Sequence, residues 1–163
     1  MFGPFKKGLL ADWLGETLAD IVFKTNTEAK SEGPDCDASR DVIFSELVYL
    51  DTFLVEQAVT ALFPGTEIGA KINKAYLSRL VQHNLQKTDG TFSRAYDERR
   101  SAYLSGWSLP LTEPVLTHLA GQACMRCASL QYTLLMFFIT HISASYQGAL
   151  NVLDTRDGNY KIV

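Results

Sequence analysis

Apolar residues recur at intervals of three and four positions along most of this chain, and such spacing places them on one side of an α-helix. Turn-forming residues interrupt the pattern at positions 31–35, 64–65, 89–90 and 108–110. No segment of useful length shows the period-two alternation of a half-buried β-strand. The spacing therefore predicts an all-α fold.

About five helices are expected, and their approximate ranges are 7–30, 39–64, 66–89, 92–107 and 112–152. Short links between them favour antiparallel neighbours in an up-and-down or orthogonal helical bundle. A chain of 163 residues has the usual length of one domain and can bury a core without disulfides or metal. We expect a single helical-bundle domain over residues 1–163, in which residues 152–163 form a turn-like tail.

The last helix differs from the others in its length and in its apolar surface. Thr112 is a suitable N-cap and Pro114 fits the first turn, but periodicity continues to Val152, well beyond the average of about 11–12 residues. A kink is expected near Gly121. Because apolar residues cover most of its circumference, we expect this long helix to be central and its exposed remainder to support a homodimer.

Composition argues against several classes of partner. The formal charge is −3 and basic residues gather only in pairs, so no nucleic-acid partner is expected. The strongest apolar stretch, residues 130–142, is shorter than the roughly 20 residues that cross a bilayer, and no signal peptide is evident. Three cysteines are too few for a disulfide framework, which favours reduced thiols in the cytoplasm.

Asp51 lies in the middle of the apolar face of the second predicted helix. The apolar residues around it on that face are Phe44, Leu47, Val48, Leu54, Val55, Ala58 and Leu62, whereas Ser45, Thr52, Glu56 and Thr60 lie opposite. A charged carboxylate in a core is costly unless it finds a partner or takes up a proton. Asp51 is therefore predicted to have a specific partner.

Two other predicted helices carry ionisable residues on their apolar sides. His141 shares a face with Leu134 and Phe137, and Arg99 and Arg100 interrupt an aromatic stripe formed by Phe92, Tyr96, Tyr103 and Trp107. If these residues meet Asp51, they form either a structural network that fixes helix register or a small polar pocket. In a pocket, Asp51 would orient His141 as an acid or base while an arginine holds an anion.

Two shorter patterns suggest redox or metal chemistry. Cys124 and Cys127 form a C-x-x-C, but it falls inside the last predicted helix, away from the N-terminus that would lower a thiol pKa. No second thiol pair completes a zinc site, and His118 lies about 120° around the helix from Cys124. Close helix packing by two small buried side chains explains the pair better. The sequence thus predicts no metal or other cofactor.

Residues 35–46 resemble an EF-hand calcium loop, with ligand-type side chains at Asp35, Asp37, Ser39, Asp41 and Glu46. Arg40 stands where such a loop needs glycine, which removes the sharp turn and adds a positive charge. Ser39, Asp41 and Glu46 are equally explained as the N-cap, first-turn and surface residues of the second helix. Helix formation is the preferred interpretation.

These observations leave three hypotheses about function. The first is a non-enzymatic helical interaction protein that forms a homodimer or binds another protein, with a structural Asp51 cluster. The second is a small-molecule sensor or carrier whose pocket contains Tyr96, Tyr103, Trp107, Asp51, Arg99, Arg100 and His141 and binds a partly apolar, anionic ligand. The third is a hydrolase or lyase that uses Asp51 and His141 as an acid–base pair. The first is preferred over the second because no spacing in the sequence shows that the three helices bring these residues together. The third is weakest because no familiar catalytic motif is present.

Overall fold

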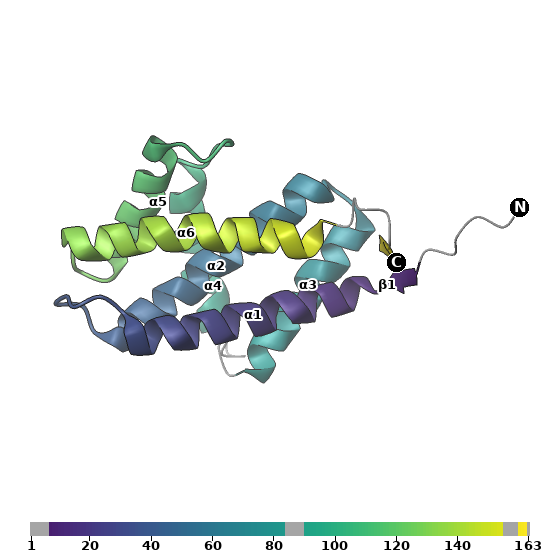
Figure 1. Ribbon diagram of the computed structural model, residues 1–163, viewed down its shortest axis with the longest axis horizontal. Helices are drawn as coiled ribbons and strands as arrows, with labels where there is room; N and C mark the ends of the chain where they lie inside the picture. Colours follow the sequence, from purple (N-terminus) through teal and green to yellow (C-terminus); the bar gives the residue numbers. More distant parts are fainter. Residues whose placement is uncertain (1–6, 84–89, 155–159, 163) are drawn as a thin grey trace, which may run out of the picture.

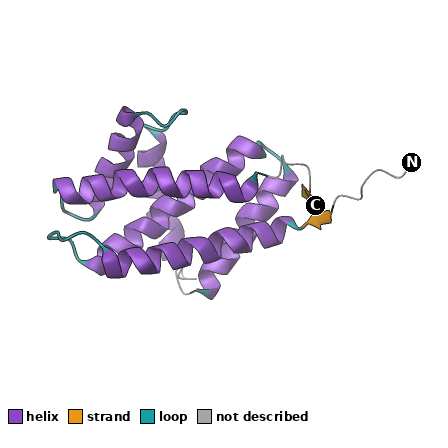
Figure 2. Ribbon diagram, in the orientation of Figure 1, coloured by secondary structure: helices purple, strands orange, loops and turns teal. Residues whose placement is uncertain are grey.

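The computed structural model describes residues 7–83, 90–154 and 160–162, and it is all-α apart from one short strand pair (Figures 1 and 2). The helices within these residues are α1 (Ala11–Glu32), α2 (Arg40–Leu62), α3 (Glu67–Gln82), α4 (Thr91–Leu104), α5 (Glu113–Arg126) and α6 (Tyr132–Leu153). They pack as a helical bundle. The predicted fold class is confirmed, with six helices in place of about five.

The central helix of the bundle is α2, not the C-terminal helix predicted from the sequence. It contacts α1, α3, α4, α5 and α6. Side chains on nearly every side of its middle are buried, including Thr52, which was expected to face solvent. The Thr52 hydroxyl donates to the Val48 carbonyl at 2.7 Å and lies 3.3 Å from the Tyr76 hydroxyl. Internal partners of this kind allow polar residues to lie within a central helix.

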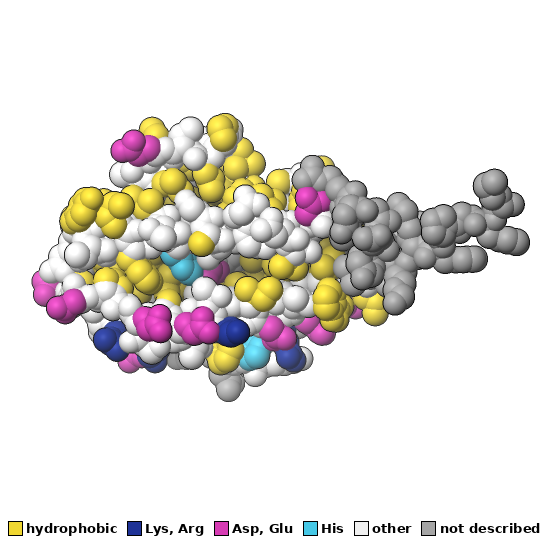
Figure 3. Space-filling model, viewed as in Figure 1, with side chains coloured by type: hydrophobic (Ala, Val, Ile, Leu, Met, Phe, Trp, Pro, Cys, Tyr) yellow, Lys and Arg dark blue, Asp and Glu magenta, His cyan; other side chains and the backbone are white. Residues whose placement is uncertain are grey.

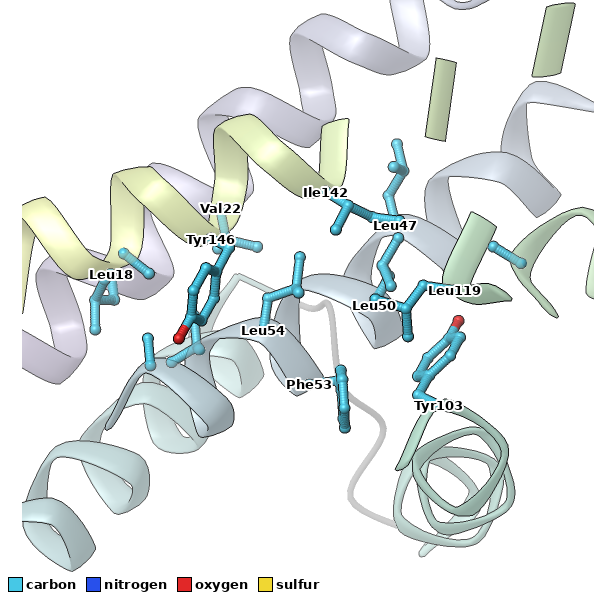
Figure 4. Packing of buried hydrophobic residues seen from close by; sticks show 14 of the residues in the cluster. Leu18, Val22, Leu47, Leu50, Phe53, Leu54, Tyr103, Leu119, Ile142 and Tyr146 are labelled. Carbon is cyan, nitrogen blue, oxygen red and sulfur yellow. The ribbon is translucent and has the colours of Figure 1, made fainter. Parts of the chain in front are cut away.

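The core is formed where side chains from the other helices meet α2. Figure 4 shows Leu47, Leu50, Phe53 and Leu54 of α2 lying toward apolar groups from neighbouring helices. Those neighbours include Leu18 and Val22 from α1, Tyr103 from α4, Leu119 from α5, and Ile142 and Tyr146 from α6. Burial of this apolar surface is the main favourable contribution to folding.

Helix α1 packs closely along α3, and Gly15 permits the short distance between them. A Cβ atom at residue 15 would lie 2.3 Å from the carbonyl oxygen of Ile72, which is a backbone atom. Any side chain here would force the two helices apart. Near the other end of this pair, Arg79 donates to both carboxylate oxygens of Asp20, at 2.7 and 3.2 Å.

The predicted helix over residues 112–152 is two helices, α5 and α6, and the break lies after Gly121 rather than at it. At the end of α5, the Ala128 N–H donates to the Met125 carbonyl and the Ser129 N–H donates to the Cys124 carbonyl, both at 3.1 Å. This pair of bonds is a Schellman motif. Ala128 has a φ of 51°, in the left-handed region that glycine usually occupies.

Two short strands, one before the first helix and one after the last, lie side by side (Figure 1). Strand β1 (Lys7–Leu9) pairs in parallel with β2 (Tyr160–Ile162), in the register Lys7 with Tyr160 and Leu9 with Ile162. The first helix therefore begins later than predicted, at Ala11. The rest of the predicted tail, residues 155–159 and 163, lies outside the described residues. The predicted end of the third helix, within residues 84–89, also lies outside them.

The left-handed Ala128 predicts a stabilising substitution. Ala128→Gly should raise the unfolding free energy by up to about 1 kcal/mol, because glycine adopts this conformation without steric penalty. Thermal unfolding should shift upward by roughly 3 °C. Ala70→Gly, at an exposed position inside α3, is the matched control and should lower stability. If Ala128→Gly lowered the unfolding free energy as much as Ala70→Gly does, the Schellman assignment would be contradicted.

Candidate functional site

The structure brings Asp51 and His141 together between α2 and α6. The Nε2 atom of His141 lies 2.8 Å from Oδ1 of Asp51. Both side chains are almost completely buried, with exposed fractions of 2% for Asp51 and 7% for His141. Asp51 thus has a charge-complementary partner, which is what a carboxylate in a core requires.

The Asp51 carboxylate raises the pKa of His141 above its ordinary value. Burial by itself lowers the His141 pKa, because it penalises the charged imidazolium. The negative charge of Asp51 and the hydrogen bond to it act in the opposite direction and outweigh burial. The pair therefore favours an imidazolium that donates to a carboxylate.

Ser145 also belongs to this site, although sequence analysis did not single it out. It lies one turn after His141 on α6, and its Oγ is 3.1 Å from His141 Nε2. In a serine–histidine–aspartate catalytic relay the hydroxyl and the carboxylate bind opposite nitrogens of the ring. Here both face Nε2, so the geometry does not activate Ser145 as a nucleophile. The i, i+4 spacing was the signal that could have revealed it.

A pocket opens beside this pair, between α1 and α6, with α2 as its floor. Its volume is about 220 Å³, and the residues that line it are Leu18, Ile21, Val22 and Thr25 of α1, Asp51, Leu54 and Val55 of α2, and His141, Ala144, Ser145, Gly148, Ala149 and Val152 of α6. In Figure 3 a histidine and an acidic group lie together in a hollow between the two helices. We call this space the Asp51 pocket.

Small residues on α6 create the entrance to the Asp51 pocket. Ala144 and Gly148 are exposed and lie four residues apart on the helix face that looks toward α1. A Cβ atom at Gly148 would meet no other atom within 4 Å. The pocket therefore has free space where most helices would carry a larger side chain.

One oxygen of Asp51 has no partner among the described residues. Oδ1 is engaged by His141, but Oδ2 is buried without a hydrogen bond. A buried acceptor left in this state costs about 1–3 kcal/mol, and more when it is charged. A donor on a molecule at the floor of the pocket would supply the missing interaction.

The arginines do not join Asp51. Arg99 binds the carboxylate of Glu46 and stacks on Tyr49, with its guanidinium carbon 4.2 Å from the ring centre. Arg100 binds Glu56 through Nε at 2.8 Å and Nη2 at 2.6 Å. Glu46 and Glu56 each lie five positions from Asp51 in the sequence. This spacing separates each glutamate from Asp51 by about 140° around the axis of α2. Both arginines therefore bind a different side of α2.

Glu46 was expected at the surface of the second helix, and the structure shows that this was wrong. Its side chain is 3% exposed and forms the buried ion pair with Arg99. Desolvation lowers the Arg99 pKa, but the hydrogen bond and charge of Glu46 reverse this and raise it. Glu46 and Glu56 are the carboxylate partners of α4 that sequence analysis missed.

The aromatic residues predicted to line the site lie on the α4 side of the bundle, away from the Asp51 pocket. Tyr96 donates to Glu56 at 2.5 Å. Tyr103 and Trp107 pack on Phe53, with ring centroids 5.3 and 5.4 Å away. Tyr96 also borders a second pocket of about 210 Å³ with Thr52, Glu56, Asn73, Tyr76 and Leu77. The charge of Glu56 there is already matched by Arg100.

The cysteine and calcium-like patterns have structural explanations. Cys124 lies in the last turn of α5 and Cys127 caps its C-terminus, a correction to their expected place inside a long helix. Burial raises the pKa of Cys124 to about 11 and that of Cys127 to about 12, which disfavours the reactive thiolate.

In the calcium-like segment, Ser39 accepts from the Val42 N–H, and Asp41 pairs with Lys30 at 2.6 Å. Ser39 thus acts as the N-cap of α2. Over the described ranges, no three His, Cys, Asp or Glu side chains are grouped closely enough to hold a metal ion.

Comparison of this chain with protein-family models, with curated proteins and with solved structures finds no match. Among the helices of the described segments, none is long and apolar enough to cross a lipid bilayer. Function must therefore be inferred from the geometry of the site.

The His141–Asp51 pair predicts a pH-dependent contribution to stability. The folded-state pKa of His141 is raised, so the pair stabilises the protein fully below the unfolded-state pKa, about 6.5, and this contribution is lost as pH rises through the folded-state pKa. Asp51→Asn should lower the unfolding free energy by about 2 kcal/mol at pH 6 and by less at pH 9.

Urea unfolding at several pH values measures this difference. Asp35→Asn is the matched control, because Asp35 is exposed, and its effect should be small at every pH. An Asp51→Asn effect that is constant or grows between pH 6 and 9 would show that the pair does not stabilise charged His141.

Proposed function

We propose that this protein is a non-enzymatic binding protein for a small molecule that occupies the Asp51 pocket. The observation that carries the proposal is Asp51, which lines a space of 220 Å³ and has a buried oxygen, Oδ2, without a hydrogen-bond partner among the described residues. Binding sites typically combine an apolar wall with a few polar groups that fix the orientation of the ligand. The Asp51 pocket has this composition.

The volume of the pocket sets the size of the ligand. An engineered apolar cavity of about 150 Å³ binds benzene, so 220 Å³ accommodates a moderately larger molecule. One turn of a helix, about 10 Å wide and 5.4 Å long, would need roughly 400 Å³. The size therefore favours a small organic molecule over a helix of a partner protein.

Most of the pocket wall is apolar, which requires a ligand with an apolar body. Leu18, Ile21 and Val22 form one side, and Ala149 and Val152 contribute to the other. Apolar surface that is buried between the ligand and this wall favours binding by roughly 25 cal/mol per Å², before the entropic costs of association are subtracted. The polar groups in the wall are Thr25, Asp51, His141 and Ser145.

The structure does not favour the anionic ligand that was expected from the sequence. An anionic ligand required Arg99 or Arg100 beside Asp51, but both arginines bind glutamates elsewhere. Among the described residues that line the pocket there is no lysine or arginine. The ligand is therefore partly apolar, as expected from the sequence, but carries no negative charge.

Filling the pocket tests the proposal. Wild-type protein titrated with 2-phenylethanol, as a neutral probe, should show saturable NMR shifts for Leu54, Ala149 and other pocket residues. Gly148→Leu should abolish these shifts, because the new side chain projects into the free space at residue 148. The fold should be retained, since replacing glycine within a helix removes a penalty of up to about 1 kcal/mol.

Gly121→Leu is the matched control for this experiment. Gly121 is also helical, a Cβ atom there also meets no other atom within 4 Å, and it does not line the Asp51 pocket. It should bind the probe like wild type. Absence of saturable binding to wild type at millimolar probe, or equal binding by Gly148→Leu, would overturn the proposed function.

Self-association is a second candidate function, and exposed apolar residues around the α5–α6 link favour it. Met125, Leu130 and Tyr132 are 54%, 75% and 73% exposed. Large exposed apolar groups close together are typical of interaction surfaces. We propose that a homodimer, in the cytoplasm expected for reduced thiols, buries this region, and such a dimer is compatible with ligand binding at the Asp51 pocket.

Sedimentation equilibrium tests the homodimer. Wild type at about 100 μM should sediment as a dimer, a concentration well above the Kd of a stable interface of standard size. Leu130→Asp should sediment as a monomer with an unchanged circular dichroism spectrum, because Leu130 is exposed in the free chain. A monomeric wild type would exclude this candidate.

A further inference from the structure

We infer that the Asp51 pocket selects ligands that carry an amine, and that the ammonium group of the ligand donates to Oδ2 of Asp51. This inference rests on the proposed function and names its ligand class. The donor must be small enough to reach the floor of the pocket beside His141. A primary ammonium on an apolar body meets both requirements.

The charges around the pocket favour a cation over an anion. Asp51 and His141 are the charged residues of its wall, and together they are neutral when His141 is protonated. A carboxylate ligand would approach the unpartnered oxygen of Asp51, and like charges this close repel strongly. An ammonium would instead form a charge-assisted hydrogen bond, which is roughly twice as strong as a neutral one.

The polar atoms near Asp51 match the several donors of an ammonium. Oδ2 has no partner within the described parts of the chain, and Ser145 Oγ lies close by, because it shares His141 Nε2 with the carboxylate. The Ser145 hydroxyl can accept one hydrogen bond from a ligand. A neutral alcohol can donate only one hydrogen bond and carries no charge, so it should bind more weakly.

An ammonium and a protonated His141 would compete for the same carboxylate. His141 faces Asp51 from α2, Ser145 and Phe137 from its own helix, and apolar or hydroxyl side chains from α1. Among these described neighbours, Asp51 is the titratable group. Bound amine therefore favours neutral His141. Binding releases a proton, and amine affinity rises with pH until His141 is neutral in the free protein.

Three probes of similar size test the ligand class on the wild-type protein: 2-phenylethylamine, 2-phenylethanol and phenylacetate. At pH 8 the amine should bind at least about tenfold more tightly than the alcohol, and phenylacetate should bind most weakly. The amine affinity should increase between pH 6 and pH 8, whereas the affinity for the alcohol should change less. Titration followed by NMR reports both the affinity and the site.

Asp51→Asn removes the charge while it keeps the shape of the side chain. It should lower the affinity for the amine to about that for the alcohol, because the charge-assisted hydrogen bond is lost. Asp35→Asn, at an exposed position outside the pocket, should leave all affinities unchanged. The wild-type order of affinities decides the question even if Asp51→Asn does not fold.

The outcomes separate this inference from the proposed function. Saturable binding of the alcohol with equal or weaker binding of the amine would overturn the amine assignment and leave a small-molecule pocket. Tightest binding of phenylacetate would also overturn it and would restore the anionic ligand expected from the sequence. Failure of all three probes to bind in the pocket would overturn the proposed function itself.

Discussion

The contact between His141 and Asp51 holds the central helix against the last one, and the Asp51 pocket depends on it. The two side chains meet at 2.8 Å and are almost fully buried. Removing either partner would leave the other as an uncompensated polar group in the core. Because α6 is fixed to α2 in this way, its small residues Ala144 and Gly148 face α1 across open space, which forms the pocket.

The same central helix carries acidic residues toward different neighbours. Asp51 contacts α6, whereas Glu46 and Glu56 bind arginines of α4. Each ion pair specifies which face of α2 a neighbouring helix covers, in addition to the apolar packing that drives association. The two arginine pairs are satisfied within the protein. Asp51 differs because one of its oxygens has no partner among the residues that the structure describes, and this difference identifies the candidate site.

The sequence predicted the helical fold and the buried position of Asp51, because period and face follow directly from residue spacing. It did not predict the break between α5 and α6. Glycine usually marks the left-handed residue that ends a helix, but here that residue is Ala128. It could not decide whether Arg99 and Arg100 meet Asp51, because the rotation of α4 about α2 depends on tertiary packing. Glu46 was assigned to the surface for the same reason. The pocket arises from the spacing of α1 and α6, which no local pattern encodes.

The candidate site depends on the buried, charge-complementary pair that Asp51 and His141 form beside the pocket. An NMR titration of the His141 imidazole measures this most directly. We expect a His141 pKa above its ordinary value in the wild-type protein, because Asp51 outweighs the effect of burial. In Asp51→Asn, where burial acts without the carboxylate, the His141 pKa should fall below its ordinary value. A wild-type His141 pKa at or below about 6.5 would show that Asp51 does not stabilise the charged imidazolium.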